Sequence, residues 1–398
     1  MKPHSLIQTS CLVILATAGV YSAVQLKNMG NARANNSDSS TSSIQRAATL
    51  KTRGEARIAA NDEALGLSYL SAALALNSTD DKLRVRIATL RAKTVLKRPM
   101  MVDAQTAIGL QVLFESVLDV SSPTSPQIAI ALGKVLTVRG LQTEAIEILD
   151  DAIKAYPTSA EALLFRADVS LQRQKWAEGL ERLNKASELD ESNSLVQYGR
   201  GIALYAQDKF EDALIAFTKA ANGLAIGEVW LQVGNTAARL EKWEVAENAF
   251  IKAERLEQSI TVKAPLYATT LARRGKLEQA VQAANVRAQR TGDLRSYADL
   301  SSWYLELKKY ASALPILMEL RKVQSKEPDF DCKLGYAWEK LDKATKALEF
   351  FKQCEQKAKG VEARKQVFDF AQNKVRALTA AEVPRDPVES QIAAPQTP

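Results

Sequence analysis

The chain has 398 residues, of which 46% are hydrophobic and 25% are charged, and its net charge is +7. This is the composition of a folded protein, and it excludes both a disordered chain and a polytopic membrane protein. The one histidine, His4, precedes every segment that can fold, which excludes histidine acid–base chemistry and histidine metal ligation from the folded part. Glycine and proline number only 17 and 12, so helices should dominate.

The first element is an uncharged apolar segment, residues 6–26, which follows a short basic start, residues 1–5. At about 1.5 Å per residue it is about 31 Å long, which matches the hydrocarbon core of a bilayer. We interpret it as a single-pass signal anchor in the cytoplasmic (inner) membrane, with the N-terminus in the cytosol and the body extracytoplasmic, or periplasmic. The sequence Ala16-Thr17-Ala18 also fits a signal-peptide cleavage site, so a cleaved, soluble periplasmic protein is the alternative.

Beyond this segment, residues 27–46 are rich in Asn and Ser and predict a flexible tether. A pattern of paired amphipathic segments then recurs about every 34 residues. The clearest copy begins at Ser194 and the next at Gly227. Both carry small residues at the eighth, twentieth and twenty-seventh places and Phe at the twenty-fourth: Gly201, Ala213, Ala220 and Phe217, then Gly234, Ala246, Ala253 and Phe250. Small residues allow two antiparallel helices to approach closely, and we expect each Phe to fill the gap to the next unit.

This spacing resembles the tetratricopeptide repeat, a helix-turn-helix unit of about 34 residues. Extended in both directions, the pattern gives nine unit starts: Ala47, Asp81, Pro126, Ala160, Ser194, Gly227, Thr261, Leu294 and Pro328. The predicted fold class is therefore all-α, an α-solenoid of about nine units. The resemblance implies a right-handed superhelix with a concave groove. A plain helical bundle is the alternative.

The regular spacing breaks at one interval, residues 81–125, which is 45 residues long. Pro265 and Pro315 fall within predicted helices, where we expect kinks. The expected organisation after the tether is N-terminal units at 47–125, divergent at 81–125, then regular units at 126–358, a C-terminal capping helix at 360–378 and a disordered Pro-rich tail at 379–398.

The resemblance also implies where a partner would bind. In this family the inner face comes mainly from the second, fifth, ninth and twelfth places of each first helix. We expect Tyr198, Ile202 and Tyr205 to receive a short peptide and Asn235 to hold its backbone amides. Ordinary core packing is the alternative, because an error of one place in the register exchanges groove for core. The candidate groove residues are Leu164, Leu171, Tyr198, Ile202, Tyr205, Leu231 and Asn235, and the same places also hold Asp168, Leu195, Cys332, Tyr336 and Glu339.

A basic run forms a second candidate surface, which includes Lys82, Arg84, Arg86, Arg91 and Lys93. Anionic headgroups or an acidic partner fit such a surface, and a solvated helix face is the simpler interpretation. Nucleic acid is not expected, because the charge of +7 is spread over a long chain of interspersed signs.

Motifs for catalysis are missing: there is no P-loop, nucleophile elbow, zinc-protease helix or CxxC pair. We therefore expect no enzyme activity, no cofactor and no metal. Cys332 and Cys354 fall in one unit, where the family register directs Cys332 to the groove and Cys354 to the core. A bond between them looks geometrically unfavourable in that register, so we predict two reduced thiols.

Together these features resemble bacterial single-span tetratricopeptide scaffolds. The expected function is protein–protein interaction through the groove in a cell-envelope assembly of the secretion, pilus, cytochrome or polysaccharide export type. A polysaccharide-binding solenoid is a further alternative, in which exposed Trp and Tyr rings stack on sugars. Trp176 and Trp243 weaken it, because they occupy a place that normally packs between helices. The sequence specifies neither the partner nor the oligomeric state.

Overall fold

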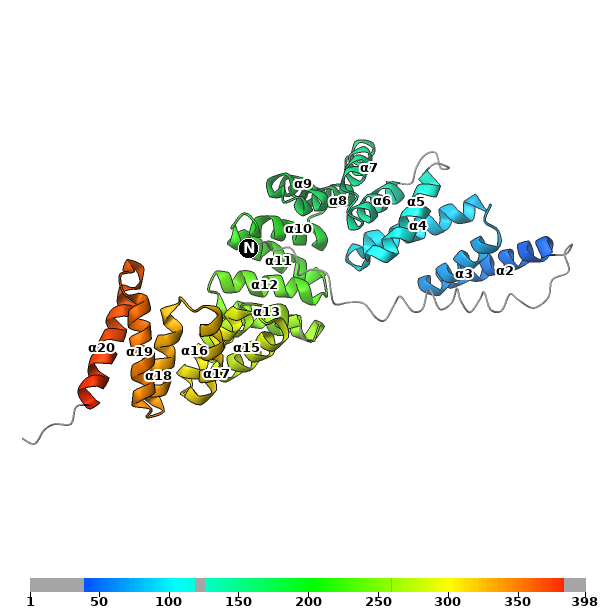
Figure 1. Ribbon diagram of the computed structural model, residues 1–398. Helices are drawn as coiled ribbons and strands as arrows, with labels where there is room; N and C mark the ends of the chain where they lie inside the picture. Colours follow the sequence, from blue (N-terminus) through cyan, green and yellow to red (C-terminus); the bar gives the residue numbers. More distant parts are fainter. Residues whose placement is uncertain (1–38, 119–125, 259, 383–398) are drawn as a thin grey trace, which may run out of the picture. The chain divides into compact units, whose positions relative to one another are not determined.

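The computed structural model describes residues 39–118, 126–258 and 260–382 (Figure 1). In these ranges the chain forms nineteen α-helices, three short 3-10 helices and no strand, so the all-α prediction is confirmed. The chain divides into two compact units, Met1–Ser192 and Asn193–Pro398.

The α-helices alternate as first and second helices of successive hairpins. The first helices are α2 (Ser39–Ala59), α4 (Asp81–Lys97), α6 (Pro126–Val138), α8 (Ala160–Gln172), α10 (Ser194–Tyr205), α12 (Gly227–Arg239), α14 (Tyr267–Arg273), α16 (Leu294–Glu306) and α18 (Pro328–Lys340). The second helices are α3 (Glu63–Leu76), α5 (Ala104–Leu118), α7 (Gln142–Ala155), α9 (Trp176–Leu189), α11 (Phe210–Gly223), α13 (Trp243–Leu256), α15 (Leu277–Thr291), α17 (Tyr310–Val323) and α19 (Ala344–Ala358). The last helix is α20 (Lys365–Glu382), and the 3-10 helices are η1 (Pro99–Met101), η2 (Ile260–Lys263) and η3 (Glu362–Arg364).

Within each unit, a helix packs mainly against its neighbours in sequence, as α10 does against α11 and α12 against α13. Each hairpin therefore shares its interior with the next one, which is the arrangement of a solenoid rather than of a closed bundle.

Local chemistry explains where the first helices begin. Asp80 accepts a hydrogen bond from the backbone N–H of Leu83, and Asn193 caps α10 in the same way. Pro126 and Pro328 are first residues, a position where the missing N–H of proline leaves no bond unmade. Seven of the nine expected unit starts are the first residue of a first helix: Asp81, Pro126, Ala160, Ser194, Gly227, Leu294 and Pro328.

The turn inside a hairpin has a constant geometry. Eight of the nine second helices begin two residues after a residue with positive φ: Asn61, Gly140, Gln174, Asp208, Glu241, Gly275, Lys308 and Asp342. This left-handed residue ends the first helix and reverses the chain, and Gly140 and Gly275 adopt it without steric strain. The exception is α5, which follows η1 instead.

Glycine at the eighth place of a first helix permits very close packing. A Cβ atom on Gly201 would lie 2.5 Å from the Phe217 ring, and one on Gly234 would lie 2.6 Å from the Phe250 ring. Each Phe thus packs on the glycine of its own hairpin. Phe250 also contacts the ring of Tyr267 in the following helix, at 5.3 Å between centroids.

Three first or second helices depart from the regular pattern. Helix α2 begins at Ser39 rather than Ala47, so the last part of the expected tether is helical. Helix α14 has only seven residues and begins after Pro265, because a proline there ends η2 and delays the next helix. Pro315 lies inside α17, as its sequence position predicted.

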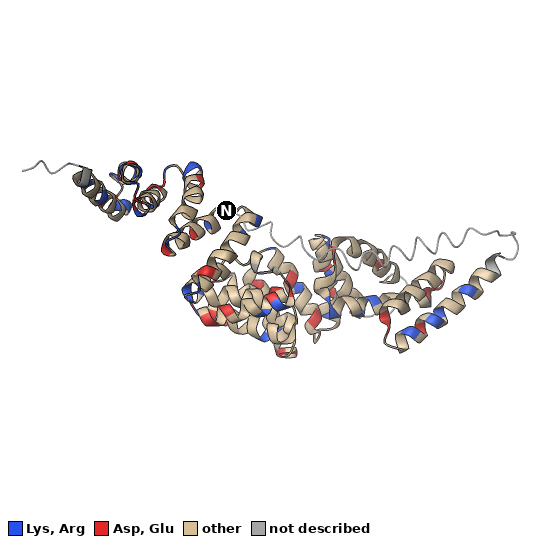
Figure 2. Cartoon of the chain, turned by 90° about the horizontal axis from the view of Figure 1, so that it is seen from below, with Lys and Arg blue, Asp and Glu red and all other residues tan. Residues whose placement is uncertain are grey.

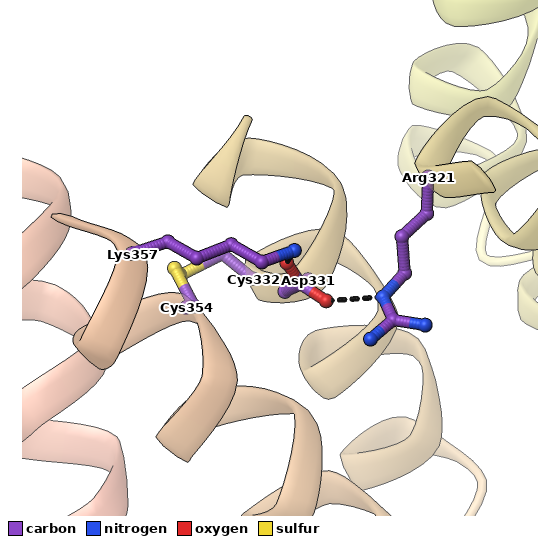
Figure 3. The surroundings of a disulfide bond; sticks show 5 residues. All are labelled: Arg321, Asp331, Cys332, Cys354 and Lys357. Atoms are coloured by element: carbon purple, nitrogen blue, oxygen red, sulfur yellow. Dashed lines mark hydrogen bonds and ion pairs between the residues drawn. A yellow bond between two sulfur atoms is a disulfide. The ribbon is translucent and has the colours of Figure 1, made fainter. Parts of the chain in front are cut away.

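The two cysteines of the last hairpin form a disulfide, so the prediction of reduced thiols is wrong (Figure 3). Their Cα atoms are 5.3 Å apart, a usual distance for a disulfide. The physical reason is the direction of Cys332: it points into the core between α18 and α19, where Cys354 also lies, and not toward a groove. The buried carboxylate of Asp331 lies beside the disulfide and accepts hydrogen bonds from Arg321 and Lys357.

The expected membrane segment, residues 6–26, lies outside the described residues, as does most of the expected tail. Helix α20 reaches Glu382 and so includes the first residues of the segment expected to be disordered. Among the helices of the described part, none is long and apolar enough to cross a bilayer.

Candidate functional site

Side chains at the ninth place of consecutive first helices can meet. In the unit Met1–Ser192, Lys134 on α6 and Asp168 on α8 hold this place, and their Nζ and Oδ2 atoms are 2.6 Å apart. Both side chains are largely buried, at 14% and 30% exposed. The two charges therefore neutralise each other across two repeats.

The ninth place is filled differently in the unit Asn193–Pro398. Here Ile202 on α10 and Asn235 on α12 hold it, and both are half-buried. The side-chain oxygen Oδ1 of Asn235 is buried and accepts no hydrogen bond from any described residue. Because buried polar atoms are nearly always bonded, this oxygen is an acceptor site without its donor.

Tyr205, a predicted groove residue, is held by its own chain. Its hydroxyl accepts a hydrogen bond of 2.6 Å from Nε of Arg239, and the guanidinium also lies over the rings of Tyr205 and Phe210. Arg239 on α12 thus ties α10 to the next hairpin, a role that the groove places alone did not suggest. The sequence signal for this contact is that Arg239 follows Tyr205 by one repeat length, 34 residues.

The other predicted groove residues divide by burial. Tyr198 is half-buried and its ring packs against Phe217 at 5.8 Å. Leu164, Leu171 and Leu231 are buried, at 8%, 8% and 3% exposed, so their side chains belong to the interior. The surface that α10 and α12 offer to a partner is therefore set by Tyr198, Ile202 and Asn235.

One carboxyl lies at the edge of this surface. Glu228 occupies the second place of α12 and accepts a hydrogen bond of 2.9 Å from Gln232. Burial raises the pKa of Glu228, and the bond from Gln232 opposes that rise only in part.

The basic run does not form one face. Arg86 donates two hydrogen bonds to Glu55, and Arg84 pairs with Asp81, so both are neutralised. Lys82 and Lys93 are exposed. Arg91 lies apart from them, half-buried between helices. Positive and negative side chains are interspersed along the helices in general (Figure 2).

No group of three or more His, Cys, Asp or Glu side chains in the described ranges is arranged to hold a metal ion.

The hairpins that share a core in sequence order define a helical repeat protein of the α-solenoid class. Residues 164–227 match the family model described as tetratricopeptide repeat, so this part of the chain carries tetratricopeptide repeats. This fold implies a scaffold for protein–protein interaction.

Several solved structures are similar to this chain at low identity. A tetratricopeptide repeat protein from Parabacteroides merdae is 18% identical, with 62% of this chain and 99% of that chain covered and a TM-score of 0.40. The structure of pilF of Pseudomonas aeruginosa is 24% identical, with 50% of this chain and 91% of that chain covered and a TM-score of 0.43. The structure of the APC/C complex Cut9-Hcn1 is 15% identical, with 78% of this chain and 59% of that chain covered and a TM-score of 0.44. Similarities this weak carry no argument about function. No curated protein matches the chain in sequence.

Proposed function

We propose that the protein is a non-enzymatic scaffold that binds a peptide segment of a partner across α10 and α12. The observation that carries this proposal is the buried Oδ1 of Asn235, which accepts no hydrogen bond from the described residues. A backbone N–H of a bound peptide would satisfy it. Ile202 and Tyr198 supply half-buried apolar surface for the side chains of the same peptide.

The contrast between repeats supports this choice of site. At the ninth place, Lys134 and Asp168 satisfy each other, whereas Ile202 and Asn235 cannot. A residue pair that satisfies itself stabilises the fold, and an acceptor without a donor is suited to a ligand.

The proposal extends to location. We infer that residues 6–26 anchor the chain in the cytoplasmic membrane and that the repeats lie outside the cytosol, in a secretion, pilus, cytochrome or polysaccharide export assembly. The apolar length of residues 6–26 supports the anchor. The Cys332–Cys354 disulfide supports an oxidising compartment, because such bonds persist mainly outside the cytosol.

The binding proposal is tested with a photoreactive amino acid at Ile202 in cells. The matched control places it at Ile215, an apolar residue on the second helix α11 that is 59% exposed. We expect a partner that crosslinks from position 202 and not from 215, and that is lost in Asn235→Leu. Equal capture from both positions, or capture that survives Asn235→Leu, contradicts the proposal.

The same variant separates binding from folding. Asn235→Leu removes a buried polar atom that has no partner, so its thermal midpoint should stay the same or rise. A large fall in the midpoint would mean that Asn235 serves the fold.

The location is tested by alkylating thiols in intact cells before lysis, followed by mass spectrometry of unreduced peptides. We expect a peptide linked through Cys332 and Cys354, together with an intact N-terminus on the mature chain. Two alkylated cysteines would contradict the oxidising compartment. A mature chain that begins after residue 18 would establish the cleaved form.

A further inference from the structure

The unit Met1–Ser192 contains two clefts between consecutive second helices. The α7–α9 cleft has a volume of about 530 Å³, and the α3–α5 cleft has a volume of about 500 Å³. The first helix between each pair carries an arginine. Arg91 on α4 lines the α3–α5 cleft, whereas Arg166 on α8 contacts two carboxylates of the α7–α9 cleft, Asp150 and Glu178. Their surroundings differ in charge.

Arg166 is neutralised by its own chain. Its Nε donates to Oδ1 of Asp150 at 2.8 Å, and its Nη1 lies 3.5 Å from Oε1 of Glu178 and 3.0 Å from the hydroxyl of Ser170. Asp150 and Glu178 line the α7–α9 cleft from opposite walls. This arginine is only 7% exposed, and its partners explain how a charge can be buried there.

Arg91 has no such partners. No carboxylate is among the residues that line the α3–α5 cleft, and no described residue forms a hydrogen bond or an ion pair with Arg91. Burial lowers the pKa of the Arg91 guanidinium, while Glu63 acts on it only as a more distant charge. An arginine nonetheless stays charged at neutral pH. The cleft therefore holds a partly desolvated cation that no carboxylate contacts directly.

The walls of the α3–α5 cleft are apolar and its rims are open. Leu74, Leu110 and Leu113 line the walls, and Ile87 lies at the floor. Ser71 and Gly109 lie at the rims and are exposed. A Cβ atom on Gly109 would have no neighbour within 4 Å, so space remains beside α5. An open apolar trough between two helices has the shape that receives another helix, whereas a small molecule is usually enclosed.

We propose that the α3–α5 cleft binds an amphipathic helix of a partner protein, whose apolar side chains pack on Leu74, Leu110 and Leu113 and whose Asp or Glu pairs with Arg91. A carboxylate matches the fork of a guanidinium in charge and in geometry. This site is formed by other helices than the Ile202 and Asn235 surface, so either proposal can fail without the other.

The test selects helical peptides from a displayed random library on the full-length chain, with counter-selection on the variant Gly109→Leu, which places a bulky side chain at the open rim of the cleft. The selected peptides should carry an acidic residue among apolar residues at helical spacing. Replacing that residue by Gln or Asn should weaken binding to the wild type by roughly ten- to a hundredfold. The same replacement should change nothing on Arg91→Met.

Folding is checked independently of binding. Gly109→Leu points into open space and removes a helix glycine, so its thermal midpoint should be unchanged or higher. Arg91→Met keeps an unbranched apolar stem without the charge and should also fold. A loss of peptide binding in either variant is then a loss of the site and not of the protein.

Four results would overturn the proposal. One is that no peptide distinguishes the wild type from Gly109→Leu, and another is that the selected peptides bind Arg91→Met equally well. A third is Arg91-dependent binding of dodecanoate without any peptide binding, which would assign the cleft to a small amphiphilic acid. The fourth is a wild-type dimer that Gly109→Leu dissociates, which would assign the cleft to a second copy.

Discussion

The α7–α9 and α3–α5 clefts share one architecture and differ in how a buried arginine is balanced. Around Arg166 the walls supply Asp150 and Glu178, so the charge is part of the fold. Around Arg91 the walls supply Ser71, Thr106 and leucines, so no carboxylate contacts the charge, and Glu63 acts on it only from a greater distance. The two pairs of hairpins thus share their geometry and differ in whether the buried arginine contacts a carboxylate.

The side chains at the ninth position of the first helices show a similar difference between paired and unpaired polar groups. Lys134 and Asp168 satisfy each other, whereas Asn235 keeps a buried oxygen without a donor. In both comparisons the self-satisfied site stabilises the chain, and the other site is the candidate for a partner.

The largest effect is expected from Arg166→Met. It leaves Asp150 and Glu178 without their shared cation, and should lower the free energy of unfolding by about 2–3 kcal/mol. The loss stays below that of a fully buried pair because both carboxylates keep contact with water, at 40% and 32% exposed. Urea unfolding followed by circular dichroism measures it, and a loss under about 0.5 kcal/mol would contradict a structural role for the cluster.

A smaller effect is expected when the missing carboxylate is added to the α3–α5 cleft. Gly109→Glu places an acid on the wall nearest the open space, and Gly109→Gln is its matched control. Both replace a helix glycine, so their difference reports the pair with Arg91 and should be about 1 kcal/mol in favour of Glu. Equal stabilities, or a lower stability of Gly109→Glu, would show that Arg91 does not attract a carboxylate there.

The smallest effect concerns pH. Burial tends to raise the pKa of Glu178, but the hydroxyl of Ser170 and the charges of Arg182 and Lys175 outweigh it, so the pKa falls below its ordinary 4.5. A lowered pKa means that the ionised form stabilises the folded state above pH 4.5, and that this contribution is lost as the pH falls through the lowered value. Glu178→Gln should therefore cost about 0.5 kcal/mol at pH 7, and this cost should shrink as the pH falls below 4.5. A cost that stays constant or grows toward pH 3 would exclude this carboxylate as the source.

Much of the fold follows from the sequence, because close packing demands small residues at fixed places. Gly201 lies so close to the ring of Phe217 that a larger residue would clash with it. Gly234 lies equally close to the ring of Phe250, so a glycine is needed at the same position of both repeats. Caps such as Asp80 and Asn193 then fix where the first helices begin.

The candidate sites were less predictable, since they depend on the direction of single side chains. The repeat register directed Cys332 to a groove, whereas in the structure it lies in the core with Cys354. Arg91 appeared as one of a basic run, and only the three-dimensional packing of α3, α4 and α5 separates it from Lys82 and Lys93. The sequence signal was the 45-residue interval 81–125, in which the usual turn is replaced by η1.

The most direct test of the difference between the clefts is the free energy of unfolding of Arg91→Met, measured by urea denaturation beside the wild type. We expect no loss of stability or a gain of up to about 1 kcal/mol, because the variant removes a desolvated charge that no described residue neutralises. A loss as large as that of Arg166→Met would show that Arg91 has a structural counter-ion, and would contradict the account.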